Sequence, residues 1–149
     1  EEIVIENAEK AVEDACRETG AVITEYTAGP VYMEGNRRGR HEWLIECECL
    51  PSDRELFAKT LDKTLQAVNS DYEAKRYHDI TLEPPLIRFV AKGTFYEWMR
   101  RTGRLGGQNK VPRLWNDRKY IDELTEIHMK ISSGGFWPDA SSTLTSQEN

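Results

Sequence analysis

The sequence lacks the features of several protein classes. No apolar run in its 149 residues approaches the roughly 20 residues that a membrane-spanning helix needs, so we expect no membrane partner. The first residues also lack the pattern of a signal peptide, so we expect none at this start. Its net charge of −6 gives a mildly acidic surface, which excludes a general nucleic-acid binder.

Cysteine and histidine are also scarce. The three cysteines, Cys16, Cys47 and Cys49, have neither disulfide nor zinc spacing. We interpret them as free thiols in a reducing cytosol, which predicts a cytoplasmic protein. The three histidines form no ligand pair at helical spacing, so we assign no metal site.

The motifs of a self-contained enzyme are missing as well. The sequence contains no Gly-x-Ser-x-Gly nucleophile turn, no Gly-x4-Gly-Lys-Ser/Thr phosphate loop and no Gly-x-Gly-x-x-Gly dinucleotide motif. Its acidic side chains fit the solvated faces of helices and the outer faces of strands. An independent small hydrolase is therefore excluded, because it would need a nucleophile and a base.

What the chain does contain predicts one α+β domain. A hydrophobic content of 38% over 149 residues is enough to bury a core. Apolar periodicity and turn residues indicate helices and strands in alternating groups. The predicted helices are 8–19, 52–68, 72–76, 95–101 and 116–131, and the predicted strands are 21–28, 41–49 and 86–91. We expect the first two strands to pair as a hairpin, and helices to cover a mainly antiparallel sheet.

Capping residues set the expected helix ends. Asn7 is expected to cap the first helix, and Gly20 to end it. Ser52 and Glu55 form the capping-box pattern, so we expect Ser52 to cap the next helix.

The two ends of the sequence differ from its middle. The chain opens on Glu1 rather than Met, which suits a fragment of a longer protein with something lost upstream. From Ser132 onward the sequence is rich in Ser, Thr, Gly and Pro, so we predict that 132–149 is a flexible tail. Phe136 and Trp137 are the exception, since their rings could dock on the core.

Segment 106–113 is the first candidate for chemistry. Gly106 and Gly107 let the backbone bend and let a ligand come close, while Pro112 restricts the conformations that the loop can adopt. Lys110 would offer phosphate or carboxylate oxygens a point charge, and Arg113 a planar fork. The alternative is a plain surface turn with exposed cations.

Two other groups of residues are weaker candidates. Arg37, Arg38 and Arg40 cluster in the expected hairpin loop and could bind an anion, although a solvent-exposed loop tip is the simpler explanation. Tyr72 and Arg76 are four residues apart and share one helix face, which we interpret as a structural pair rather than a ligand contact.

Three motifs in order resemble one known family. Tyr72-x-x-x-Arg76, Gly93-Thr94-Phe95 and the Gln108-x-Lys110-x-Pro-Arg run resemble the C-terminal domain of the auxin-responsive Gretchen Hagen family of acyl-acid amido synthetases. The sequence is more similar to bacterial than to plant members of the family, and segment 39–46 resembles the bacterial members too. The resemblance covers about residues 1–131, with 1–7 similar to the hinge between two domains and 8–131 to the C-terminal domain.

This resemblance implies an ATP-dependent, magnesium-dependent ligase of two domains. Such enzymes activate a small carboxylic acid as an acyl adenylate, and an amino acid then displaces AMP. The N-terminal adenylation domain holds most of the nucleotide and acyl pockets, and the small mobile C-terminal domain brings one lysine to the nucleotide. By its position in the motif that lysine is Lys110, which implies that Gly106, Gly107, Gln108 and Arg113 lie beside the nucleotide or substrate.

The resemblance also implies that this chain alone is inactive and binds no cofactor. The alternative is a free-standing module that uses the arginine-rich loop and Lys110 to bind an anionic partner without catalysis. Upstream sequence carrying a Ser/Thr/Gly-rich phosphate loop would distinguish the two hypotheses.

Overall fold

The computed structural model describes residues 3–32, 39–79, 81–105 and 110–133. Its elements follow the predicted alternation of helices and strands. In chain order they are α1 (Ile5–Thr19), β1 (Val22–Val31), β2 (Arg40–Cys49), α2 (Arg54–Val68), α3 (Ser70–Arg76), the short 3-10 helix η1 (Tyr77–Asp79), β3 (Leu86–Val90), α4 (Thr94–Arg101) and α5 (Lys119–Ser132).

The three strands form one mixed sheet in the order β1-β2-β3. Strands β1 and β2 pair in antiparallel fashion along nearly their whole length, which confirms the predicted hairpin. Strand β3 lies parallel to β2, with Glu42 opposite Leu86 and Glu46 opposite Val90. A parallel pair needs a long crossover connection, and α2 and α3 supply it. The fold class is therefore α+β with a mostly antiparallel sheet, as predicted.

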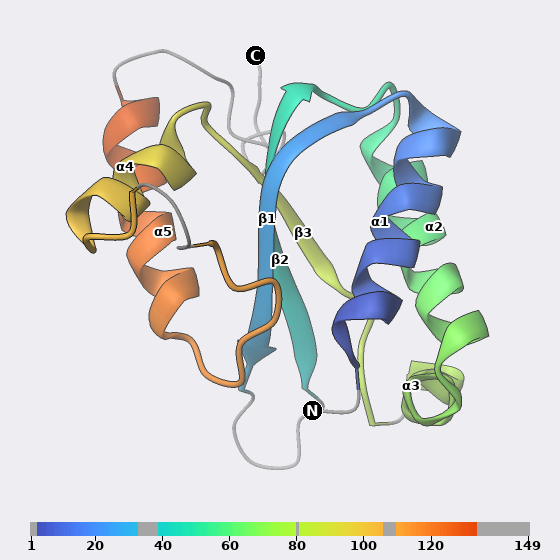
Figure 1. The fold of residues 1–149 in the computed structure, drawn as a ribbon. Coiled ribbons are helices and arrows are strands. Elements are labelled where there is room, and N and C mark those ends of the chain that lie inside the picture. The colour runs from blue at the N-terminus through green and yellow to red at the C-terminus, as the bar shows by residue number, and fades with distance from the viewer. Residues whose placement is uncertain (1–2, 33–38, 80, 106–109, 134–149) are drawn as a thin grey trace.

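Helices cover both faces of the sheet (Figure 1). Helices α1 and α2 pack against each other over one face, and α4 and α5 lie over the other. Each face has its own hydrophobic core, the first built around Trp43 and Ile45 and the second around Leu44. Leu44 lies between Trp43 and Ile45 on β2 and faces the second core.

This second core overturns the prediction that acidic side chains of the strands face solvent. Glu42 is only 4% exposed. Its carboxylate lies 2.6 Å from Arg88 Nε and 3.0 Å from Arg118 Nη1. A buried carboxylate needs such partners because desolvation of an unpaired charge is expensive.

Two predicted helix caps, Asn7 and Ser52, are wrong. Helix α1 begins at Ile5, so Asn7 lies inside the first turn, where its Oδ1 accepts a hydrogen bond from the Val4 N–H at 3.1 Å. Helix α2 is capped by Asp53, whose Oδ1 accepts from the Leu56 N–H at 3.0 Å, rather than by Ser52. The Asp53 carboxylate also suits the positive end of the helix dipole.

Other helix ends agree with the prediction or differ by a few residues. Gly20 ends α1 in the left-handed region, at φ 77°, as predicted. Helix α5 begins at Lys119 instead of 116–117, because the side chain of Asp117 accepts a hydrogen bond from the Lys119 N–H. The predicted docking of Phe136 and Trp137, with nearly all of the predicted tail, lies outside the described residues.

Candidate functional site

The pair Tyr72 and Arg76 on α3 is bound to one carboxylate of α2. Asp62 Oδ1 accepts from the Tyr72 hydroxyl at 2.6 Å and from Arg76 Nε at 2.8 Å. Asp62 Oδ2 accepts from Arg76 Nη2 at 2.6 Å. The side chains of Arg76 and Asp62 are 9% and 13% exposed, and burial with the neighbouring Asp62 raises the pKa of Tyr72. The interpretation of Tyr72 and Arg76 as a structural pair is therefore confirmed, with Asp62 as the residue that sequence reasoning missed.

The Gly-Thr-Phe motif forms the start of α4. Gly93 precedes the helix at φ 92°, a left-handed conformation that favours glycine. Thr94 is fully buried and donates its hydroxyl to the Ala91 carbonyl at 2.6 Å. Glu46 reaches across from β2, where Oε1 accepts from the Phe95 N–H at 3.0 Å and Oε2 from the Gly93 N–H at 3.2 Å. A side chain of the sheet thus caps this helix.

We expect Glu46→Ala to lower the free energy of unfolding by about 2 kcal/mol, because two N–H groups at the start of α4 lose a charged acceptor. Chemical denaturation followed by circular dichroism measures the change. Glu48→Ala is the matched control, since Glu48 is on the same strand with a side chain that is 68% exposed and pairs with Lys92 only at 3.9 Å. Its change should stay within about 0.5 kcal/mol. Equal losses in both variants would contradict the capping role.

The segment after Lys110 is hydrogen-bonded along the outer edge of β1. The Ala28 N–H donates to the Arg113 carbonyl at 2.9 Å, and the Trp115 N–H donates to the Ala28 carbonyl at 2.9 Å. The Thr27 hydroxyl donates to the Pro112 carbonyl at 2.6 Å. Segment 111–115 therefore covers an edge of the sheet that would otherwise expose unpaired backbone groups.

Side chains at both ends hold this segment in place. Val111 is buried in the second core, while Leu114 packs against the first. Beyond it, Arg118 donates to the Pro30 carbonyl at 3.0 Å and pairs with the buried Glu42. The backbone on the C-terminal side of Lys110 is consequently fixed by contacts with residues some 85 positions away in sequence, as for Thr27 and Pro112.

The side chain of Arg113 makes its contacts within the domain, on β1. Its Nη1 lies 2.7 Å from Glu25 Oε1 and donates to the Tyr26 carbonyl at 3.0 Å. The guanidinium carbon lies 4.5 Å from the centre of the Tyr26 ring. Burial raises the pKa of Tyr26 to about 12, although the charge of Arg113 opposes the shift. In this structure Arg113 acts as an anchor between the segment and β1.

Lys110 differs from Arg113 in its exposure and in its contacts. It is exposed, and no hydrogen bond or ion pair joins it to any other residue that the structure describes. Gly106, Gly107 and Gln108 precede it outside the described residues, so the structure does not test their predicted place beside a nucleotide. The outcome is a cation exposed to solvent one residue before a segment that is firmly attached to the sheet.

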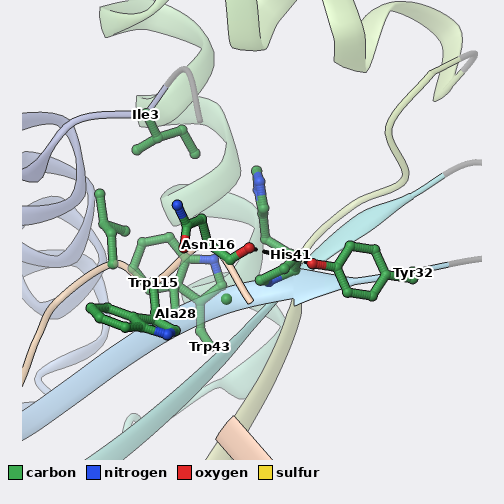
Figure 2. A pocket seen from close by; sticks show the side chains of 10 residues that line it. Ile3, Ala28, Tyr32, His41, Trp43, Trp115 and Asn116 are labelled. Atoms are coloured by element: carbon green, nitrogen blue, oxygen red, sulfur yellow. Dashed lines mark hydrogen bonds between the residues drawn. The ribbon is translucent and has the colours of Figure 1, made fainter. Parts of the chain in front are cut away.

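A pocket of about 120 Å³ lies beside the same segment (Figure 2). Segments distant in sequence build it: the start of the chain, the end of β1, the start of β2 and the loop before α5. At its rim, the Tyr32 hydroxyl donates to the Asn116 carbonyl at 3.3 Å. Sequence reasoning missed this pocket because no local motif marks it.

The other candidate sites gain little support. Arg37 and Arg38 lie outside the described residues, and Arg40 pairs with Glu83 at 3.8 Å. Within the described ranges, no three His, Cys, Asp or Glu side chains gather as metal ligands would. In the same part of the chain, no helix is long and apolar enough to cross a membrane.

Comparison with known proteins points to one family. Residues 6–119 match the profile of the GH3 family C-terminal domain. The fold resembles that of AtGH3.15 acyl acid amido synthetase in complex with 2,4-DB, with a TM-score of 0.62 and 21% identity over 80% of this chain. A second structure of GH3.15 acyl acid amido synthetase gives a TM-score of 0.61 and 22% identity over 83% of this chain. At this identity the two structures show likeness of fold alone.

The match covers only part of those proteins. This chain spans 23% of the length of either solved structure. Among curated proteins, none matches the chain.

Proposed function

The chain belongs to the GH3 family as its C-terminal domain, and from this premise we propose that it works in an ATP-dependent ligase that joins a small carboxylic acid to an amino acid. Lys110 supplies a cation for the first of two steps. The observation that supports this role is the exposed ammonium group of Lys110 beside a backbone segment fixed to β1. A catalytic cation needs both properties, access to the substrate and a preorganised position.

In the proposed first step, a carboxylate oxygen attacks the α-phosphorus of ATP. The bond from that phosphorus to the bridging oxygen of the β-phosphate breaks, and pyrophosphate leaves. Negative charge grows on the oxygens around phosphorus, where a lysine ammonium group stabilises it as a point charge. In the second step the amino acid nitrogen attacks the acyl carbon, AMP leaves with the bonding electrons, and the nitrogen loses a proton.

The proposal gives the remaining site residues distinct roles. Arg113 holds the segment against β1 through Glu25 and Tyr26, so it positions Lys110 and is proposed to lie beside the nucleotide when the domain closes. Gly106, Gly107 and Gln108 precede Lys110 and are proposed to lie beside the substrate when the domain closes. An adenylation domain N-terminal to this chain is the proposed partner, and movement of the small domain brings Lys110 in for the first step.

The described residues offer a group that suits ATP, but they offer none that we assign to magnesium. The exposed Lys110 suits a phosphate oxygen of the substrate ATP. The residues that the structure describes bring together no cluster of three or more His, Cys, Asp or Glu side chains, so the proposal assigns magnesium no ligand in this part of the chain.

Exchange of pyrophosphate into ATP tests the proposed function. We expect acid-dependent exchange from a protein that joins this chain to its adenylation domain, and no exchange from the 149-residue chain alone. Exchange by the chain alone would contradict the two-domain proposal. A joined protein that binds anions at the Lys110 side but never exchanges pyrophosphate would favour the free-standing binding module instead.

A further inference from the structure

Both ends of the loop that carries Lys110 reach the same aromatic side chain. Residues 105–110 separate Arg104, in the turn after α4, from Val111, where the segment along β1 begins. Val111 is buried in the second core together with Tyr120 of α5. Arg104 contacts the same tyrosine, because its Nη2 donates to the Tyr120 hydroxyl at 2.8 Å. Lys110 thus belongs to a short loop whose two ends are attached to one layer of the domain.

Aromatic rings hold the half-buried side chain of Arg104. Its guanidinium carbon lies 5.1 Å from the centre of the Trp98 ring and 5.3 Å from that of the Tyr120 ring, which is within the range of cation–π attraction. The two rings pack edge to face with their centres 5.0 Å apart. Among the described residues no carboxylate pairs with this guanidinium, whereas nearby Arg101 pairs with Glu97. The place of Arg104 therefore depends on two rings and one hydroxyl group.

The chain on both sides of the loop is also fixed in this layer. Before the loop, the Arg104 N–H donates to the Met99 carbonyl at 2.7 Å. After it, the ring centre of Trp115 lies 4.5 Å from that of Tyr120. Fixed ends reduce the number of conformations that a loop can adopt. A catalytic cation benefits from this restriction, because its position is then set before the substrate binds.

We propose that Arg104 is a second positioning residue, which fixes the upstream end of the loop and so sets the place of Lys110. Trp98 and Tyr120 are the surfaces that hold it. The inference rests on the proposed role of Lys110. Arg113 and the hydrogen bonds along β1 fix the downstream end, but a loop fixed at one end alone still samples many positions. Arg104 acts through Lys110, so its loss affects only the step in which Lys110 acts.

The geometry of this contact requires arginine in particular. A guanidinium group is planar, so it lies against an aromatic ring and still directs an N–H group at a hydroxyl oxygen. A lysine ammonium group is a compact, strongly hydrated point charge and does not reproduce both contacts. Arg104→Lys therefore keeps the charge and loses the anchor. If Arg104 served only to attract a negatively charged substrate, lysine would be sufficient.

Pyrophosphate exchange by a protein that joins this chain to its adenylation domain tests the inference. We expect Arg104→Ala to lower kcat about tenfold and to leave KM for ATP within about twofold, because Lys110 stabilises charge that develops in the transition state. Arg104→Lys should not restore kcat. Tyr120→Phe, which removes only the hydroxyl, should cause a smaller loss. The matched control is Arg101→Ala, at an arginine of α4 that is 44% exposed, and it should change neither value.

A double variant separates positioning from a general loss of structure. In the Lys110→Ala background, Arg104→Ala should slow exchange no further, because no ammonium group is left to position. Amide formation from a supplied acyl adenylate should also be nearly unchanged in Arg104→Ala. A loss that persists without Lys110, or an equal loss in both steps, would mean that Arg104 only maintains the fold. A higher KM with an unchanged kcat would make it a nucleotide contact, and either result would overturn the inference.

The two proposals about this loop fail separately. If Lys110→Ala slows exchange while Arg104→Ala and Tyr120→Phe do not, the positioning role is wrong and the role of Lys110 stands. If neither Lys110→Ala nor Arg104→Ala slows exchange, both proposals are wrong.

Discussion

Replacing Lys110 with alanine, in an enzyme that joins this chain to its adenylation domain, is expected to slow acyl adenylate formation by about 10²–10³-fold. That is the usual loss when one preorganised donor at a developing charge is removed. Lys110→Arg should not restore the rate, because a planar guanidinium does not replace a compact ammonium group. Pyrophosphate exchange measures this step directly.

The second step of the reaction provides the internal control. Amide formation from a supplied acyl adenylate, measured in a single turnover, should be far less affected by Lys110→Ala, since the cation acts before pyrophosphate leaves. Lys130→Ala, at an exposed lysine of α5, should change neither step. Equal damage to both steps would mean that Lys110 supports the loop or a domain interface. No damage to either would make it an ordinary surface lysine.

Asp62→Ala is expected to have the largest effect on stability, lowering the free energy of unfolding by about 3–5 kcal/mol. Removing the carboxylate takes a bidentate charged acceptor from the nearly buried guanidinium of Arg76, and it leaves the Tyr72 hydroxyl without its acceptor. Breaking one partner of a buried ion pair has effects of this size. Urea denaturation of the 149-residue chain measures the loss.

Two further variants separate the charge pair from its surroundings. Lys63→Ala changes the exposed neighbour of Asp62 on α2 and should alter stability by no more than about 0.5 kcal/mol. Tyr72→Phe removes only the hydroxyl, so its loss should be smaller than that of Asp62→Ala. An Asp62→Ala variant as stable as Lys63→Ala would show that the three side chains do not act as a network.

The three family motifs have different physical meanings in this structure. Tyr72 and Arg76 connect α3 to α2, and Gly93-Thr94-Phe95 begins α4 under the carboxylate of Glu46. Both arrangements are fully satisfied within the domain, so they maintain the fold. The third motif alone presents an exposed cation among its described residues, at Lys110. A motif shared with a family thus identifies the domain more securely than it identifies a catalytic residue.

The sequence predicted those features that depend on local patterns. The apolar alternation of Trp43, Ile45 and Cys47 identified one face of β2, and Gly20 identified the end of α1. The cap of α2 was missed because Ser52 and Asp53 are both good capping residues, and their order in the sequence does not decide between them.

Features that depend on distant contacts could not be predicted in this way. Glu42 and Glu46 look like solvent-facing residues of a strand, but β3 and the layer of α4 and α5 over that face give them partners. The pocket is likewise formed by segments as far apart as Ile3 and Asn116. Periodicity describes which residues share a face, but it does not describe what covers that face.

The two separate cores have a consequence for how the domain opens. Proteins unfold locally in cooperative units, and a sheet with an independent core on each face provides a natural division between two such units. Val111 belongs to the core beneath α4 and α5, whereas Trp43 belongs to the core beneath α1 and α2. Partial unfolding of the α4–α5 layer would therefore remove the packing of Val111 next to Lys110, while the hydrogen bonds of the following residues to β1 remained. The lysine would then hang from a segment fixed on one side only.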